Sequence, residues 1–298
     1  MKRRPAAIDT TALAALPVRL GEYRSLRIIQ VGCGGTGSHL ARMTAACAAA
    51  VRDRGETVEL VFCDHDTVEP KNVPRQLFAA ADIGRPKAEV IARRYAAAWG
   101  LETTIDRSPF SAANYGLGGY RHDRRLTVIV GAVDNAAARR EMARACEENG
   151  EYGLPSVWWI DAGNAADSGQ VLVGTDTKSR NLRGSVQLGA VWRLPAPSLT
   201  APDLLVARDG ENADAKMSCA ELVAANLQSL TVNGWAATIA GDTLYRLVVS
   251  RNLTRFGTWF DARSGTVRST PTAPAEIARA AGCRESALLP RTPRRTAA

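Results

Sequence analysis

Short apolar runs alternate with longer alanine-rich segments along the first half of the chain. The apolar runs, which are typical of buried strands, lie at residues 26–31, 58–63 and 127–133. The segments after them have the length and periodicity of helices, and we predict helices at residues 38–51, 86–99 and 135–149. Strands that alternate with helices form right-handed βαβ units. The pattern therefore predicts an α/β fold with a Rossmann-like, mainly parallel sheet.

The second half of the chain has a different pattern. Strand-like runs at residues 156–160, 170–173 and 186–194 are separated by polar turns, and residues 258–268 resemble a hairpin that turns at Ser264-Gly265. These runs predict a mixed or antiparallel extension of the sheet. Between them we expect a Pro-rich loop at residues 195–217 and a long apolar helix at residues 219–249.

We find no internal repeat, and we predict one domain over residues 1–270. Residues 271–298 are rich in Pro, Ala and Arg and predict a weakly ordered tail.

Composition places the chain among ordinary globular proteins. It has 298 residues, of which 46% are hydrophobic and 23% are charged. No apolar run approaches the roughly 20 residues that cross a bilayer, and the N-terminus lacks the apolar core of a signal peptide. We expect a cytoplasmic protein that does not insert into membranes.

The net charge of +8 raises the question of nucleic-acid binding. Six basic residues of the two ends account for most of that charge, namely Lys2, Arg3, Arg4, Arg291, Arg294 and Arg295. The body of the chain between them is close to balanced. Solvated ends explain this pattern more simply than a nucleic-acid partner, which stays a weakly supported alternative.

Cysteine and histidine spacing gives little sign of a metal site. The six cysteines include no C-x-x-C pair, and they stand at Cys33, Cys47, Cys63, Cys146, Cys219 and Cys283. This spacing predicts no structural zinc, and a cytosolic chain predicts no disulfides. The three histidines, His39, His65 and His122, are too dispersed to suggest a metal cluster.

The sequence GCGGTGS at residues 32–38 follows a predicted strand and opens a predicted helix. Glycines in that context permit a tight turn whose backbone N–H groups approach phosphate at a helix N-terminus. An NAD enzyme is one interpretation, but its ribose-binding acid lies about 20 residues beyond the glycines. Here Asp64 lies 27 residues after Gly37, and Arg75 and Lys87 supply cations that hydride transfer does not need.

Four motifs in order now resemble a known superfamily. GCGGTGS, DHDTVEPKNVPRQ, DIGRPKAE and VDNAAARR, spread over about residues 25–145, are similar to the ThiF/MoeB/ubiquitin-activating-enzyme superfamily. Members adenylate a carboxylate with ATP, typically the C-terminal glycine of a ubiquitin-like protein. The resemblance places the nucleotide-binding part at about residues 25–150. A narrower resemblance is to the ThiF-related proteins of the bacterial PRTRC plasmid cassette.

The resemblance implies a role for each matching residue. Asp64 would hold the ribose of ATP, Asp134 would bind Mg²⁺, and Lys87 would reach the phosphates from the next helix. The full set of expected ATP contacts is Gly32, Gly34, Gly35, Gly37, Asp64, Asp66, Asn72, Arg75, Gln76, Lys87 and Asn135. Arg75, Lys87 and the metal-binding Asp134 would be catalytic residues.

The chemistry of adenylyl transfer suits such a set. A carboxylate is already ionised at neutral pH, so its attack on the α-phosphate needs no general base. What must be stabilised is negative charge on the phosphates and on the departing pyrophosphate, and fixed cations and a metal do this. Taken alone, each of these residues could be a surface charge or a cap. We assign no role to His65, and we do not expect the Asp64-His65-Asp66 trio to be a metal site.

Some relatives pass the activated carboxylate to a cysteine, and Cys219 is the best match here. It follows the predicted loop and opens the predicted long helix, and a helix N-terminus lowers the pKa of a thiol. A small apolar residue that fills space is the alternative. The resemblance also implies a homodimer with an arginine reaching the partner's site, for which Arg19 and Arg24 are the candidates.

Three interpretations besides the adenylation of a small β-grasp protein stay open. The acceptor could be a small molecule or a tRNA group, for which the basic ends would matter. The protein could be a non-enzymatic nucleotide-binding scaffold of a plasmid-associated complex. An NAD dehydrogenase is the least favoured.

Overall fold

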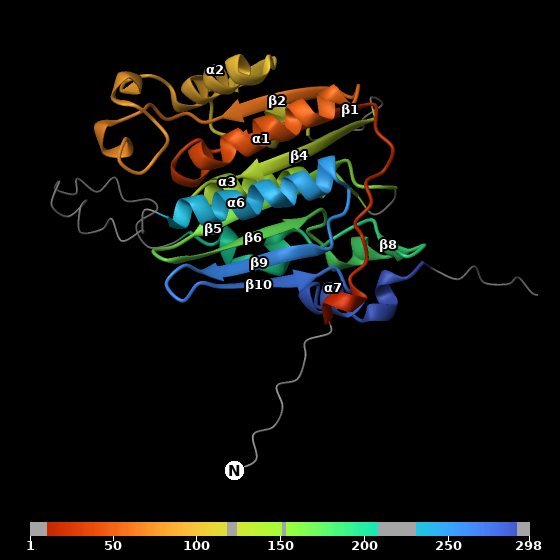
Figure 1. Ribbon diagram of the computed structural model, residues 1–298. Helices are drawn as coiled ribbons and strands as arrows, with labels where there is room; N and C mark the ends of the chain where they lie inside the picture. The colour runs from red at the N-terminus through yellow and green to blue at the C-terminus, as the bar shows by residue number, and fades with distance from the viewer. Residues whose placement is uncertain (1–10, 118–123, 151–152, 208–230, 291–298) are drawn as a thin grey trace, which may run out of the picture.

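The computed structural model describes residues 11–117, 124–150, 153–207 and 231–290. Over these residues, eight strands form one sheet in the order β10-β9-β6-β5-β4-β1-β2-β3, and β7 pairs with β8 (Figure 1). The strands are β1 Ser25–Val31, β2 Thr57–Cys63, β3 Thr103–Asp106, β4 Arg125–Gly131, β5 Val157–Asn164, β6 Ser168–Gly174, β7 Val186–Gln187, β8 Ala190–Val191, β9 Arg255–Asp261 and β10 Thr266–Pro271. The α-helices are α1 Gly35–Asp53, α2 Lys87–Trp99, α3 Ala136–Glu147, α4 Pro197–Thr200, α6 Val232–Leu244 and α7 Pro274–Ala280.

The sheet is parallel in its first part and antiparallel in its second. Strands β1 to β5 pair in parallel, whereas β6 pairs antiparallel with β5 and β9, and β9 pairs antiparallel with β10. This confirms the predicted Rossmann-like sheet with a later antiparallel extension. The register aligns Cys63, Val31, Gly131 and Asp161 in one row across β2, β1, β4 and β5.

Each face of the parallel strands buries its own set of side chains. Ile28 of β1 packs in one cluster with Leu40 of α1, while the next residue, Ile29, packs in another with Met142 of α3. Successive side chains of a strand point to opposite faces, so a strand covered by helices on both faces is apolar throughout. Figure 1 shows α1 and α6 side by side across the sheet, in agreement with their extensive contacts.

The single strand predicted at residues 186–194 is wrong. The chain reverses in its middle, where Leu188 and Gly189 both have positive φ (53° and 69°), and the two short strands β7 and β8 flank this turn. Two successive residues with positive φ form the tight turn that joins strands in a hairpin. Glycine adopts this conformation readily, whereas the exposed Leu188 gave no signal of it in the sequence.

Two further segments are more ordered than predicted. The described part of the predicted loop at residues 195–217 contains α4 and a 3₁₀ turn at Pro202–Leu205. The tail predicted from residue 271 contains α7, whose Ile277 is fully buried, and Leu288 beyond it is fully buried too. These apolar side chains pack in the core against the second half of the sheet. The composition of this segment, rich in Pro and Arg, gave no indication of that packing.

The predicted helix at residues 219–249 lies partly outside the described residues. Its described part is α6 followed by a π-helical turn at Tyr245–Val249.

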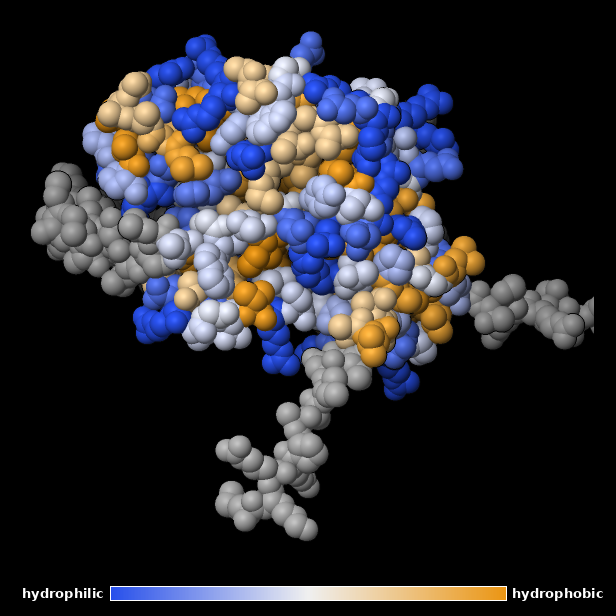
Figure 2. All heavy atoms as spheres, viewed as in Figure 1, coloured by the Kyte–Doolittle hydropathy of each residue, from blue (hydrophilic) through white to orange (hydrophobic). Residues whose placement is uncertain are grey.

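Within the described residues, no helix has both the length and the apolar character to cross a bilayer. On the face that Figure 2 shows, apolar residues are interspersed with polar ones.

A buried ion pair ties together the segments that precede β5, follow β6 and follow β8. Arg193 Nη1 lies 2.6 Å from Asp176 Oδ1, and both side chains are almost fully buried. The same guanidinium donates to the carbonyls of Gly150 and Gly153 at 3.0 and 2.7 Å. Burial raises the pKa of Asp176 to about 6, and Arg193 acts against that rise.

We predict that Arg193→Met destabilises the protein by about 3–5 kcal/mol, because it leaves the buried Asp176 carboxylate without its partner. Loss of Arg193 raises the pKa of folded Asp176 further above its unfolded value. A carboxyl with a raised pKa stabilises the folded state while it is protonated, and this stabilisation falls as pH rises from the unfolded pKa to the folded one. In wild type the fall ends near pH 6, whereas in the variant it continues to higher pH. The difference in the free energy of unfolding between wild type and variant therefore grows above pH 6. Urea unfolding at pH 5 and pH 8 measures this. Arg183→Met, at an exposed position, is the control, and an equal deficit at both pH values would contradict the predicted role of Asp176.

Candidate functional site

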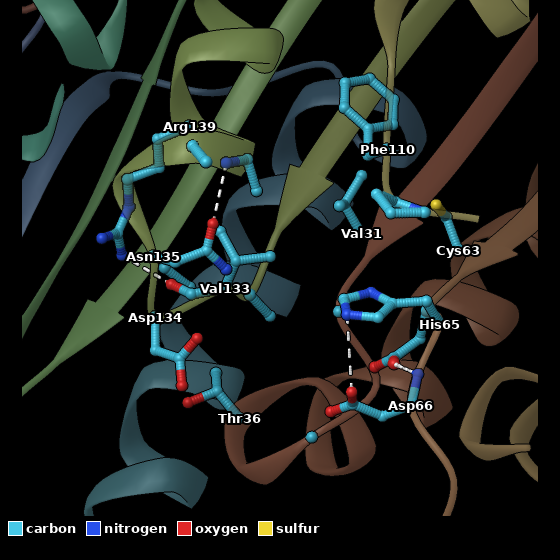
Figure 3. A pocket seen from close by; sticks show the side chains of 18 of the residues that line it. Val31, Thr36, Cys63, His65, Asp66, Phe110, Val133, Asp134, Asn135 and Arg139 are labelled. Carbon is cyan, nitrogen blue, oxygen red and sulfur yellow. Dashed lines mark hydrogen bonds and ion pairs between the residues drawn. The ribbon is translucent and has the colours of Figure 1, made fainter. Parts of the chain in front are cut away.

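A large cavity lies where the strand order changes direction. From β1 the chain proceeds outward through β2 and β3, then returns to place β4 and β5 on the other side of β1. Loops after neighbouring parallel strands separate at such a point and open a crevice that binds ligands. A cavity of about 910 Å³ lies there, lined by the ends of β1, β2, β4 and β5 and by residues of α1, α3 and α6 (Figure 3).

The glycine turn, residues 32–37, joins β1 to α1 at one wall of this cavity. Gly32 has a φ of 91°, and a Cβ on Gly37 would lie only 2.1 Å from the Gly32 carbonyl oxygen. Gln30 Nε2 donates to the carbonyls of both glycines, at 3.1 and 2.8 Å. These close contacts require glycine at both positions and fix the turn whose N–H groups open α1.

Asp64 connects the glycine turn to the end of β2. Its Oδ2 accepts a hydrogen bond from the Cys33 backbone N–H at 2.6 Å, and its Oδ1 accepts one from the Asp66 N–H at 2.8 Å. Burial raises the pKa of Asp64, while these two amides and Lys87 act against the rise. The Asp64 carboxyl is therefore held by backbone amides at the place where a ribose is expected.

Lys87 brings a positive charge to the same wall. Its side chain is 7% exposed, and Nζ lies 2.8 Å from Asp66 Oδ2. Partial burial alone would raise the pKa of Asp66, but the hydrogen bond and charge of Lys87 lower it. The first turn of α2 thus supplies a fixed cation beside the end of β2.

Asp134 and Asn135 stand across the cavity from His65 and Asp66 (Figure 3). Asn135 caps α3, since its Oδ1 accepts a hydrogen bond from the Ala138 N–H at 2.9 Å. Asp134 lines the cavity and is exposed, and its carboxylate makes no hydrogen bond or ion pair with the described part of the chain. It is therefore available to a ligand.

Arg139 supports this turn and was not predicted. Its Nη2 donates to the Val133 carbonyl at 2.7 Å, and its Nε lies 3.1 Å from Asp161 Oδ1. Burial raises the pKa of Asp161, and Arg139 opposes the rise. The motif VDNAAARR contains Arg139, but only the fold reveals that β5 supplies its partner.

Other cavity residues also escaped prediction. Phe110 forms part of the wall beyond β3 and stacks on Tyr115 with ring centroids 5.5 Å apart. Thr36, Asn164 and Asn233 line the cavity from α1, β5 and α6. Of these, only Thr36 lay within one of the four motifs, and the pattern that predicted a helix over residues 219–249 gave no role to Asn233.

Nine predicted residues line the cavity, namely Gly32, Gly34, Gly35, Asp64, Asp66, Gln76, Lys87, Asp134 and Asn135. Three others do not. Gly37, the last residue of the glycine turn, packs against the Gly32 carbonyl, and Asn72 is buried and accepts a hydrogen bond from the Glu69 N–H through Oδ1. Arg75 lines a neighbouring hollow of about 500 Å³ with His39 and Gln76. Contacts of Gly37, Asn72 and Arg75 with ATP stay predictions.

The Asp64-His65-Asp66 trio brings its ligand atoms within 4.8 Å of one another. Asp64 already accepts two backbone hydrogen bonds, and the Lys87 ammonium bound to Asp66 would repel a metal ion. These contacts favour our prediction that the trio is not a metal site.

Cys219 lies outside the described residues. Burial raises the pKa of each described cysteine thiol, to about 12 for Cys47 and Cys63. A raised pKa leaves little thiolate, so these five are poor nucleophiles.

The sequence model of the ThiF family matches residues 18–275. The chain belongs to the ThiF family. Similar proteins include ubiquitin-like modifier-activating enzyme 5 of Dictyostelium discoideum, 28% identical over 150 residues, which are 47% of this chain and 35% of that protein. Human ubiquitin-like modifier-activating enzyme 7 is 32% identical over 130 residues, 42% of this chain and 12% of that protein. The ThiF-family chain thus covers only about a third or less of these relatives.

Solved structures of similar fold include E. coli MccB with AMPCPP and MccA, at a TM-score of 0.52 and 14% identity. That match covers 83% of this chain and 64% of MccB. PaaA matches with a TM-score of 0.51 and 13% identity, over 84% of this chain and 64% of PaaA. At such identities the likeness shows the fold, which agrees with the sheet described above.

We predict that Gly37→Ala destabilises the protein by about 3 kcal/mol or more, because its Cβ would collide with the Gly32 carbonyl. Gly34→Ala is the matched control, since the nearest atom to its Cβ would be Gln76 Nε2 at 3.9 Å. Thermal and urea unfolding compare the two variants. Equal stability of both would show that the close packing inside the glycine turn is not required.

Proposed function

We propose that the protein is an ATP-dependent adenylyltransferase that activates a carboxylate and releases pyrophosphate. The acceptor in this proposal is the C-terminal carboxylate of a small ubiquitin-like, β-grasp protein. The observation that carries the proposal is the meeting, in one cavity, of the glycine turn, the Lys87 cation and the unengaged Asp134 carboxylate. Relatives named ubiquitin-like modifier-activating enzymes support it, as do solved structures of E. coli MccB with ATP.

The cavity suits ATP in size and chemistry. Its volume of about 910 Å³ is at the upper end of the range usual for small-molecule sites. Apolar Val31 and Phe110 line it together with Asp64, so an adenine and a ribose would both find matching groups. The N-terminus of α1 and the Lys87 ammonium provide the positive potential that phosphates require.

Mg²⁺ also fits the residues present. Carboxylate oxygens and phosphate oxygens are the ligands that Mg²⁺ prefers, and Asp134 offers an unengaged carboxylate on the side of the cavity opposite Asp66. When bound, the ion would neutralise charge on the phosphates. Arg139 would keep Asp134 in place by holding the preceding carbonyl of Val133.

The reaction needs few groups from the protein. A carboxylate oxygen of the acceptor forms a bond to the α-phosphorus of ATP, and the bond from that phosphorus to the bridging oxygen of pyrophosphate breaks. No proton moves, because the acceptor is already ionised. The glycine turn N–H groups hold the α-phosphate, and Lys87 stabilises charge on the departing pyrophosphate.

The remaining features of the proposal rest on resemblance. They are the homodimer, the roles of Arg19, Arg24 and Cys219, and a place in a PRTRC plasmid cassette. A small-molecule or tRNA acceptor and a non-enzymatic scaffold are alternative outcomes of the experiment that follows.

We predict that wild type catalyses exchange between ATP and labelled pyrophosphate when it is supplied with a suitable small β-grasp protein ending in glycine. Asp134→Asn should lower the exchange rate by about 100-fold or more, because a metal ion contributes several kcal/mol of charge stabilisation. Asp53→Asn, at a side chain that is 65% exposed, is the control and should exchange normally.

Normal exchange in Asp134→Asn would show that the Asp134 carboxylate is not the ligand of a catalytic metal ion. ATP binding without exchange across β-grasp proteins, small carboxylates and tRNA would favour the scaffold. Binding of NAD that ATP does not displace would revive the dehydrogenase.

A further inference from the structure

Three polar side chains from distant parts of the chain meet at the β5 side of the cavity. Thr36 Oγ1 lies 2.9 Å from Asn164 Oδ1 and 3.1 Å from Asn233 Oδ1, and Asn164 Nδ2 donates to Asn233 Oδ1 at 3.1 Å. Thr36 is 6% exposed and Asn233 is 5% exposed, and all three line the cavity. We call them the Thr36 cluster. The proposed binding of ATP and Mg²⁺ requires none of these three side chains.

The cluster holds the Asn233 amide in one orientation. Because Oδ1 accepts from both neighbours, Nδ2 is directed away from them, and it makes no hydrogen bond with the described residues. A Cβ added to Gly35 would lie 2.9 Å from this Nδ2 and 3.0 Å from Oδ1, so the amide packs directly against the glycine turn. Asn233 lines the cavity, so an oxygen of a ligand bound there can accept a hydrogen bond from this donor.

The sheet places Asn164 at the same edge as the ATP-binding groups. The register puts Cys63 of β2, Val31 of β1, Gly131 of β4 and Asp161 of β5 in one row, with neighbouring strands about 4.8 Å apart, and β5 continues for three residues beyond Asp161 to Asn164. Asp64 follows β2, the glycine turn follows β1, and Asn164 ends β5 three strands away from β2. A ribose at Asp64 and an α-phosphate at the glycine turn therefore leave the β5 end of the cavity for the group that attacks the phosphorus.

Charge also distinguishes the two ends. Lys87 lies on the β2 side, where it can stabilise a departing pyrophosphate, and attacking and departing oxygens lie roughly in line through the phosphorus. At the β5 end, Arg139 is paired with Asp161, and the Thr36 cluster is neutral. Neutral amide donors can hold a carboxylate without pairing its charge with a cation, so the carboxylate stays a good nucleophile.

We propose that the Thr36 cluster is the acyl subsite of the enzyme, where the Asn233 amide, held by Thr36 and Asn164, binds the carboxylate that becomes adenylated. This inference rests on the proposed adenylyltransferase function and names the residues that recognise its second substrate. Asn233 Nδ2 donates to an oxygen of the carboxylate, and later to the carbonyl oxygen of the acyl adenylate. Thr36 and Asn164 are positioning residues for that amide.

The test compares two ligands that differ by an acyl group. AMP carries no acyl group, whereas 5′-O-(N-acetylsulfamoyl)adenosine is a stable analogue of an acyl adenylate whose acetyl carbonyl stands in for the activated carboxylate. Isothermal titration calorimetry measures the Kd of each for wild type, Asn233→Leu and Asn233→Asp. Both variants keep the number and branching of the side-chain heavy atoms and remove the Nδ2 donor. Asn252→Leu, at an exposed position, is the matched control.

We expect each Asn233 variant to bind the acetylated analogue about tenfold more weakly than wild type, the loss of one good hydrogen bond. The Kd of Asn233→Leu for AMP should stay close to that of wild type, and Asn233→Asp, which keeps the Oδ1 acceptor, should keep a melting temperature close to that of wild type. Equal weakening of both ligands would overturn the inference and make the cluster a support for the nucleotide or the fold. Unchanged binding of both would overturn it as well. Wild type that binds neither ligand would instead refute the proposed function, and the acyl subsite with it.

Discussion

The hydrogen bond from the Cys33 N–H to the Asp64 carboxylate is the contact on which the site depends. It ties the loop after β1 to the end of β2, and the same carboxylate also accepts the Asp66 N–H. Both loops follow strands whose register is fixed by the core on either face of the sheet. The glycine turn therefore has one position relative to Asp64, Asp66 and Lys87, and an anionic ligand would find these groups already in place.

The remaining walls of the cavity are held with comparable rigidity. The buried Arg139–Asp161 pair fixes the turn that carries Asp134, and the Thr36 cluster joins the start of α1 to β5 and α6. Replacing a buried ion pair by apolar residues often costs a protein no stability, so such pairs are weak evidence of a stabilising role. In this pair, Arg139 also donates a hydrogen bond to the Val133 carbonyl next to Asp134, which an apolar residue could not do. The cavity thus combines a fixed cation, an unengaged carboxylate and neutral amide donors in separate places.

The sequence predicted the parts of this fold whose signals are local. The apolar strands before Gly32, Asp64 and Asp134 and the motifs after them were evident, because short buried strands and glycine turns have strong patterns. The hairpin at Leu188 and the buried Ile277 were missed, because a leucine with positive φ and a helix that docks on a distant strand leave no local pattern. Asn164 and Asn233 were missed for the same reason, since their meeting with Thr36 depends on tertiary structure. Whether Asn72 and Arg75 reach the nucleotide, as the resemblance implies, stays a prediction.

The most direct measurement is a crystal structure of the protein with Mg²⁺ and a non-hydrolysable ATP analogue. We predict that the ribose hydroxyls lie within hydrogen-bonding distance of Asp64, that the α-phosphate rests on the N–H groups of the glycine turn, and that the metal contacts Asp134. We also predict that the space beside Asn233 stays open to a second substrate. A nucleotide whose phosphates lie away from the glycine turn, or whose triphosphate fills the β5 end of the cavity, would contradict the proposed site.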